Sequence, residues 1–121
     1  MQIQELKKKS WSQLSIQEKE WLKSNGYING CGGKGGYVQP PNFFFLADCN
    51  HHDWKYTLGG GIKEYWMANW QFFMAMIKDV NRISLNIIFP FQQVFFLIFF
   101  VIALNYFIAV TIMGWKFFNW K

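Results

Sequence analysis

Asp48-Cys49-Asn50-His51-His52-Asp53-Trp54-Lys55-Tyr56 is the most informative segment of this 121-residue chain. At helical spacing four residues share one face of the predicted helix: Phe45, Cys49, His52 and Tyr56. Asp53 falls beside His52 at the edge of that face. A neutral imidazole can take a proton from water, and a neighbouring carboxylate can hold a hard cation. The segment therefore supplies two of the three parts needed for metal-assisted ester hydrolysis.

A glycine-rich segment precedes this helix and is the third part. Six glycines lie between Gly26 and Gly36, which excludes a regular helix or a central strand over about 25–41. Calcium takes several oxygen ligands at about 2.3 to 2.6 Å, and backbone carbonyls can supply them where glycine lets the chain turn tightly. A bond between Cys31 and Cys49, the two cysteines of the chain, would hold this loop over the helix.

Local signals predict three helices in the first two thirds of the chain. Ser15-Ile16-Gln17-Glu18 is a capping-box pattern and Asn25-Gly26 a stop signal, which together predict a helix over about 15–24. A second helix over about 43–58 ends at three consecutive glycines, Gly59 to Gly61, and a third follows over about 62–82. Because the connecting turn is short, the second and third helices are expected to pack antiparallel.

The last third of the chain has the composition of a membrane segment. No charged residue occurs between Arg82 and Lys116, a gap of 33 positions. A helix over about 94–115 would be roughly 33 Å long, enough for the ~30 Å hydrocarbon core, and tryptophans and lysines follow it. A buried core helix is the alternative, disfavoured because so small a domain could hardly cover it. We expect this helix to project away from the domain, with Pro90 marking either a kink or the boundary with an interfacial segment over 87–91.

The net charge of +5 suggests a phosphate-rich partner. Lys7, Lys8 and Lys9 form a run near the start, and beside an apolar anchor such a run favours anionic lipid headgroups. No nucleic-acid motif accompanies it, so nucleic acid is not an expected partner. A simple solvated segment is the other reading of the lysine run. No secretory signal is expected in the polar first residues, whereas a disulfide requires an oxidising compartment, so the compartment stays open.

These features resemble those of the phospholipase A2 superfamily, especially its compact prokaryotic and viral-type members. That family has an X-Cys-Gly-x-Gly-type calcium loop, a helix with Cys-x-x-His-Asp-x-x-Tyr, and an antiparallel helix with an acidic residue that orients the catalytic histidine. The corresponding segments here are Gly30-Cys31-Gly32-Gly33-Lys34-Gly35 and Cys49 through Tyr56. The resemblance covers about residues 27–80. It implies a small all-α domain with two antiparallel helices and a glycine-rich calcium loop, to which a C-terminal membrane helix is added.

The resemblance also implies roles for individual residues. His52 would be the general base that activates water, and Asp53 the side-chain ligand of Ca²⁺. The carbonyls of Gly30 and Gly32 would be loop ligands, and the third loop ligand is undetermined because Gly33-Lys34 leaves the register ambiguous. The Gly32 amide, with calcium, would stabilise the oxyanion formed at the sn-2 ester.

Two further features carry over from the family. Tyr56 would help to fix the helix pair, and the family disulfide falls on Cys31 and Cys49. His51 is expected to face solvent, because adjacent residues on a helix point in different directions and could not readily bind one ion together with His52.

The chain departs from the family at the residue that orients the histidine. Where an aspartate is expected on the third helix, the sequence is Ala68-Asn69-Trp70-Gln71-Phe72. An Asn69 oxygen within about 2.7 to 3.2 Å of a His52 nitrogen could still fix the tautomer, but it is neutral and stabilises the imidazolium less. Glu64 and Asp79 are the nearest carboxylates, and both lie more than a helical turn from Asn69.

The sequence therefore predicts four regions: a basic N-terminal segment with a short helix (1–24), a phospholipase A2-like core (25–82), an interfacial and transmembrane segment (83–115) and a basic aromatic tail (116–121). The expected function is calcium-dependent hydrolysis of membrane phospholipids by a single-pass membrane protein whose orientation is undetermined. Homo-oligomerisation through the membrane helix stays open. The alternative is a catalytically weak or inactive phospholipase-like protein that binds or perturbs lipid.

Overall fold

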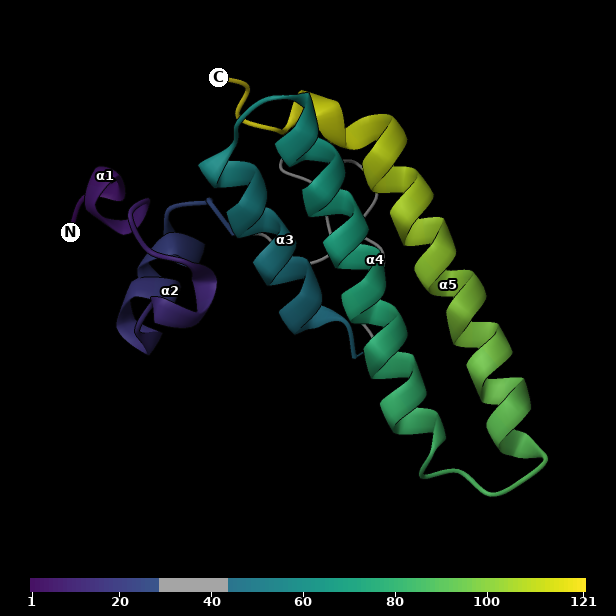
Figure 1. Cartoon of the computed structure of the whole chain (residues 1–121). Coiled ribbons are helices and arrows are strands. Elements are labelled where there is room, and N and C mark those ends of the chain that lie inside the picture. The colour runs from purple at the N-terminus through teal and green to yellow at the C-terminus, as the bar shows by residue number, and fades with distance from the viewer. Residues whose placement is uncertain (29–43) are drawn as a thin grey trace.

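The computed structural model describes residues 1–28 and 44–121, and in these ranges the chain is helical without strands (Figure 1). The helices follow in this order: α1 Ile3–Leu6, η1 Trp11–Gln13, α2 Ile16–Ser24, α3 Leu46–Leu58, α4 Ile62–Ser84, α5 Phe91–Met113 and η2 Gly114–Lys116. Helices α3, α4 and α5 lie side by side, and the N-terminal helices pack on the side of α3 away from α5. The predicted all-α class is confirmed.

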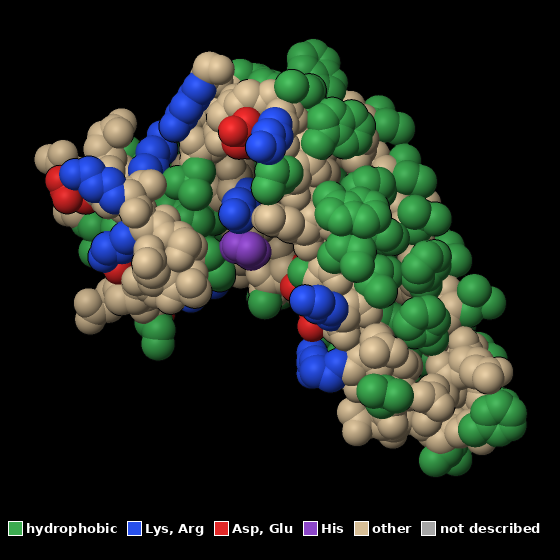
Figure 2. Space-filling view, viewed as in Figure 1, with side chains coloured by type: hydrophobic (Ala, Val, Ile, Leu, Met, Phe, Trp, Pro, Cys, Tyr) green, Lys and Arg blue, Asp and Glu red, His purple; other side chains and the backbone are tan. Residues whose placement is uncertain are grey.

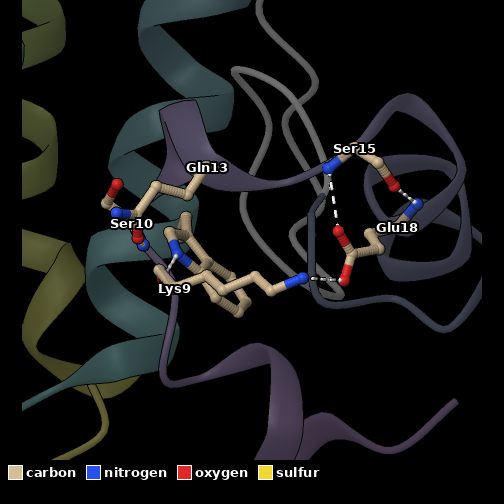
Figure 3. A network of polar contacts seen from close by, with 6 residues as sticks. Lys9, Ser10, Gln13, Ser15 and Glu18 are labelled. Carbon is tan, nitrogen blue, oxygen red and sulfur yellow. Dashed lines mark hydrogen bonds and ion pairs between the residues drawn. The ribbon is translucent and has the colours of Figure 1, made fainter.

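The N-terminal segment begins with a compact network of polar contacts (Figure 3). The hydroxyl of Ser15 accepts a hydrogen bond from the Glu18 amide at 3.1 Å, and the Glu18 carboxylate accepts one from the Ser15 amide at 2.9 Å, which confirms the predicted capping box. The other Glu18 oxygen pairs with Lys9 at 2.8 Å. The indole of Trp54 donates to the Lys9 carbonyl at 3.1 Å, so this network is tied to α3.

Helices α3 and α4 form the predicted antiparallel hairpin. The core between α3 and α4 contains the buried side chains of Phe45, Cys49, Phe72, Met76 and Val80. Gly59 has φ +73° at the turn, and a Cβ there would collide with the Asn119 backbone, so this position requires glycine. Apolar side chains spaced three to four residues apart along α4 account for this packing.

Helix α5 folds back along α4, so the expectation that it would project away from the domain is wrong (Figure 1). Phe107 of α5 lies 5.0 Å, between ring centroids, from Phe73 of α4, and Phe44 lies 5.0 Å from Phe99. Most of the remaining surface of α5 is exposed, and residues 91–116 form a segment long and apolar enough to cross a membrane. Phe73 of α4 and Phe44 before α3 both offer aromatic rings to α5. These ring contacts explain why α5 packs against the domain and does not project away from it.

The C-terminal tail closes the hairpin at the turn between α3 and α4. The Asn119 amide donates to the Tyr56 carbonyl at 3.1 Å, and the Asn119 side chain donates to the Thr57 carbonyl at 3.1 Å. Gly60 exchanges backbone hydrogen bonds with Asn119 and Lys121 at 3.0 and 2.9 Å. The tail thus satisfies carbonyls that the end of α3 leaves without a helical partner. The sequence of residues 116–121 predicts only a basic aromatic tail and not these contacts.

Candidate functional site

The predicted histidine site centres on a hydrogen bond between α3 and α4. The Nε2 atom of His52 lies 2.8 Å from the Asn69 side-chain oxygen, within the predicted range. Both side chains are buried, with exposures of 6% for His52 and 0% for Asn69. The predicted contact between Asn69 and His52 is therefore confirmed.

Tyr56 adds a second donor to the same Asn69 oxygen. Its hydroxyl lies 2.6 Å from that oxygen and 3.2 Å from the carbonyl of Val110 on α5. Tyr56 therefore links α3, α4 and α5, which agrees with its predicted role in fixing the helix pair. Because an amide oxygen only accepts, His52 donates through Nε2–H, and its lone pair resides on Nδ1. That tautomer leaves Nδ1 as the basic nitrogen.

Burial controls the protonation of His52. The ring lies between Phe72, at 4.5 Å between ring centroids, and Tyr56, at 4.2 Å. Burial lowers the pKa of His52 to about 4, which the hydrogen bond to Asn69 opposes and the neighbouring His51 reinforces. His52 is therefore neutral at pH 7, the form in which a histidine accepts a proton. His51 is half-buried rather than fully solvent-facing, and burial lowers its pKa as well.

The expected calcium ligands are only partly within the described residues. Asp53 lies next to His52 on α3 and is half-buried. Gly30, Cys31 and Gly32 lie outside the described residues. The predicted loop ligands of calcium and the predicted oxyanion contact therefore also lie outside them. In the described ranges no group of three or more histidine, cysteine or acidic side chains could hold a metal ion by itself. Asp53 therefore fits calcium only as one ligand in a set completed by backbone oxygens.

Cys49 is the member of the predicted cysteine pair that lies within the described residues. Its side chain is buried in the core with 2% exposure, and no cysteine in the described part of the chain is free. The proposed partner, Cys31, lies outside that part, so the Cys31–Cys49 bond stays a prediction.

Glu64 and Asp79, the carboxylates nearest to Asn69 in the sequence, have other partners. Glu64 accepts from the Gly61 amide at 3.0 Å and caps the start of α4. Asp79 pairs with Arg82 at 3.2 Å and also faces Asp48 of α3. Burial, reinforced by a hydrogen bond to Asp79, raises the pKa of Asp48 to about 8. Local sequence does not predict this carboxyl pair, because its members are 31 positions apart and meet only when α3 and α4 pack.

The role of Tyr65 was also not predicted from the sequence. Its hydroxyl lies 2.6 Å from the carbonyl of Thr111 and 3.1 Å from that of Val110, so it holds the end of α5 near Tyr56. Tyr65 lies four residues before Asn69, on the same face of α4, and that spacing was the available signal.

Comparisons with models of protein families, with curated proteins and with solved structures gave no match to this chain. The functional interpretation therefore depends on the residues and on their geometry.

Proposed function

We propose that this protein is a membrane-bound, calcium-dependent phospholipase A2-like enzyme that hydrolyses the sn-2 ester of glycerophospholipids. The observation that carries the proposal is the buried arrangement of His52, Asn69 and Tyr56, in which one oxygen accepts from both partners. It presents a neutral imidazole in a single tautomer next to Asp53. General-base catalysis requires this combination of protonation state and orientation.

In the proposed reaction Nδ1 of His52 takes a proton from a water molecule, and the resulting hydroxide attacks the sn-2 carbonyl carbon. The ester C–O bond then breaks, and the proton passes from His52 to the departing lysophospholipid oxygen. Asn69 and Tyr56 keep the ring oriented throughout. Calcium bound by Asp53 and the carbonyls of Gly30 and Gly32 would supply positive charge at the carbonyl oxygen, and the Gly32 amide would add a hydrogen bond there.

A second function, lipid binding with weak or no hydrolysis, is favoured by one feature of the same site. Asn69 is neutral, so its hydrogen bond offsets only part of the burial that lowers the pKa of His52. Proton transfer to His52 is therefore less favourable than it would be beside a carboxylate. The two functions predict the same membrane association and differ in turnover.

Helix α5 supports a membrane location for both functions. Its length and composition suit a membrane, and the sequence predicts a single crossing. Substrate would then lie in the bilayer to which the protein is bound.

The test is release of fatty acid from vesicles of defined phospholipid, with calcium present and after its chelation. The full chain should release fatty acid only with calcium, and His52→Gln should abolish the release. His51→Gln is the matched control, because His51 lies next to His52 but outside the hydrogen-bond network. Fatty acid release by His52→Gln would contradict the proposed hydrolase mechanism. If the unmodified chain releases no fatty acid, the hydrolase proposal is contradicted and lipid binding is favoured.

A further inference from the structure

Helix α5 is held beside α4 at both of its ends. At its start, the short connection over residues 85–90 joins it to the end of α4. At its other end, Tyr65 of α4 donates a hydrogen bond to the Thr111 carbonyl at 2.6 Å, and the tail after α5 pairs with Gly60 and Tyr56 at the turn. Between these ends, aromatic pairs such as Phe73 and Phe100 join the two helices. The two helices must therefore take the same orientation relative to a membrane.

Helix α3 is also held in place against α5. The ring of Phe44, just before α3, lies 5.0 Å from that of Phe99 near the middle of α5, and the Tyr56 hydroxyl lies 3.2 Å from the Val110 carbonyl near the end of α5. Residues 44–56 thus lie level with the part of α5 between Phe99 and Val110. If α5 stood upright across a bilayer, the half-exposed Asp53 and Lys55 of α3 would lie at the depth of the hydrocarbon. Ionised side chains at that depth are strongly disfavoured.

The polarity of the molecule runs across the three helices and not along them (Figure 2). Charged side chains lie over the N-terminal helices, over α3 and along the start and the neighbouring edge of α4, whereas apolar side chains cover the rest of α4 and the outer surface of α5. Exposed apolar residues of this face include Trp66 and Trp70 of α4 and Ile98, Val101, Ile108 and Ile112 of α5. A contiguous apolar face of this kind marks an interaction surface.

Cations border the two ends of this apolar face. Lys63 and Lys116 lie at one end, where α4 begins and α5 finishes, and Lys78 and Arg82 lie near the other. All four side chains are exposed. An apolar surface with cations at its edges matches the boundary between acyl chains and anionic headgroups. The lysine run Lys7 to Lys9 lies beyond α3 and is separate from this face.

We propose that α5 lies in the plane of the membrane, with its outer surface and the exposed side of α4 in contact with the acyl chains and both ends of α5 on the same side of the bilayer. This proposal rests on the membrane association in the proposed function and replaces the single crossing predicted from the sequence. It explains why α5 is apolar on all sides, because α3 and α4 cover one side and lipid covers the other.

The test is a labelling experiment on the full chain reconstituted in sealed vesicles that contain anionic phospholipid. A variant carries both Asn86→Cys and Lys116→Cys, two exposed positions at opposite ends of α5. A membrane-impermeant maleimide is added outside, and intact-mass spectrometry counts the labels on each molecule. The in-plane arrangement gives molecules with two labels or none, whichever way they were reconstituted. A crossing helix gives one label on every molecule, which would overturn the proposal.

Two controls make the result unambiguous. The chain without added cysteines measures any label on its native cysteines, and detergent must give two added labels on the double variant. Oriented circular dichroism of the unmodified chain in stacked bilayers gives an independent answer, since α3, α4 and α5 share one direction and should all lie in the plane. If the protein does not float with the vesicles, or forms dimers and does not bind the vesicles, the inference and the membrane part of the proposed function are both overturned. Single labelling with intact hydrolysis would overturn the inference alone.

Discussion

The imidazole of His52 and the amide of Asn69 meet across α3 and α4 at 2.8 Å, with the Asn69 oxygen as the acceptor. The other Asn69 group, its buried Nδ2, has no hydrogen-bond partner among the described residues. An aspartate at position 69 would keep the acceptor and add the negative charge that a charged imidazole requires. Asn69 thus keeps the His52 ring oriented but does not supply the negative charge that would stabilise the imidazolium.

Asn69→Asp should therefore raise both the pKa of His52 and the rate of hydrolysis. We expect the pKa to rise from about 4 by about one unit or more and the rate to increase on the order of tenfold. NMR titration of the His52 ring and fatty acid release from vesicles measure the two effects. Asn69→Ala, which removes the acceptor, should lower the rate. An unchanged rate in Asn69→Asp would show that the charge at this position does not limit the reaction.

Asp48→Asn should stabilise the protein at neutral and alkaline pH. Because burial and Asp79 raise the pKa of Asp48 from 3.8 to about 8, the folded chain binds a proton that the unfolded chain releases between these values. The free energy of unfolding contributed by Asp48 therefore falls as the pH rises through this window. After allowance for the partial exposure of Asp48, we expect a gain of about 1 kcal/mol at pH 8 and none near pH 4.

Urea unfolding of both proteins at several pH values, followed by circular dichroism in detergent, checks this difference. Asp79→Asn should also stabilise the protein at pH 8, because it removes the charge that faces Asp48. A larger gain at pH 4 than at pH 8 would contradict the carboxyl pair.

Gly114→Ala should destabilise the contact between α5 and α3. A Cβ on Gly114 would collide with the hydroxyl of Tyr56 and lie 3.0 Å from its Cε2 atom. Since Tyr56 is fixed by Asn69, we expect a loss of about 1–3 kcal/mol in the free energy of unfolding. Gly61→Ala is the control, because a Cβ there meets only a Glu64 oxygen at 3.5 Å, and it should cost about 0.5 kcal/mol or less. Equal effects of the two substitutions would argue against the docking of α5 on Tyr56.

Cys31→Ser and Cys49→Ser should each lower the free energy of unfolding by about 3 kcal/mol, the contribution expected when a disulfide closes a loop of this length. Buried Cys49 lies at the core face of α3, so its partner would draw the glycine-rich loop toward His52. Peptide mapping without reductant checks the Cys31–Cys49 bond directly. Two free thiols in the oxidised, folded protein would remove the basis for placing a calcium loop over α3.

The sequence was sufficient to predict features set by local chemistry. The capping box at Ser15 and Glu18 and the glycine turn after Leu58 each depend on residues a few positions apart, and both are present. The His52–Asn69 contact was also predictable, because two helices joined by a three-residue turn have little freedom of register. Helical spacing then brings residues 17 positions apart to the same level.

Only the tertiary structure decided where α5 lies. Its uniform apolar composition predicts a helix but no preferred face, so sequence periodicity could not tell an extended span from one folded back on α4. The deciding contacts are the Tyr65 and Tyr56 hydroxyls on the carbonyls of α5 and the Asn119 tail on the α3–α4 turn. They join residues about 45 to 60 positions apart, and several use backbone atoms, which carry no sequence signal. The packing of distant segments therefore sets how this chain presents itself to a membrane.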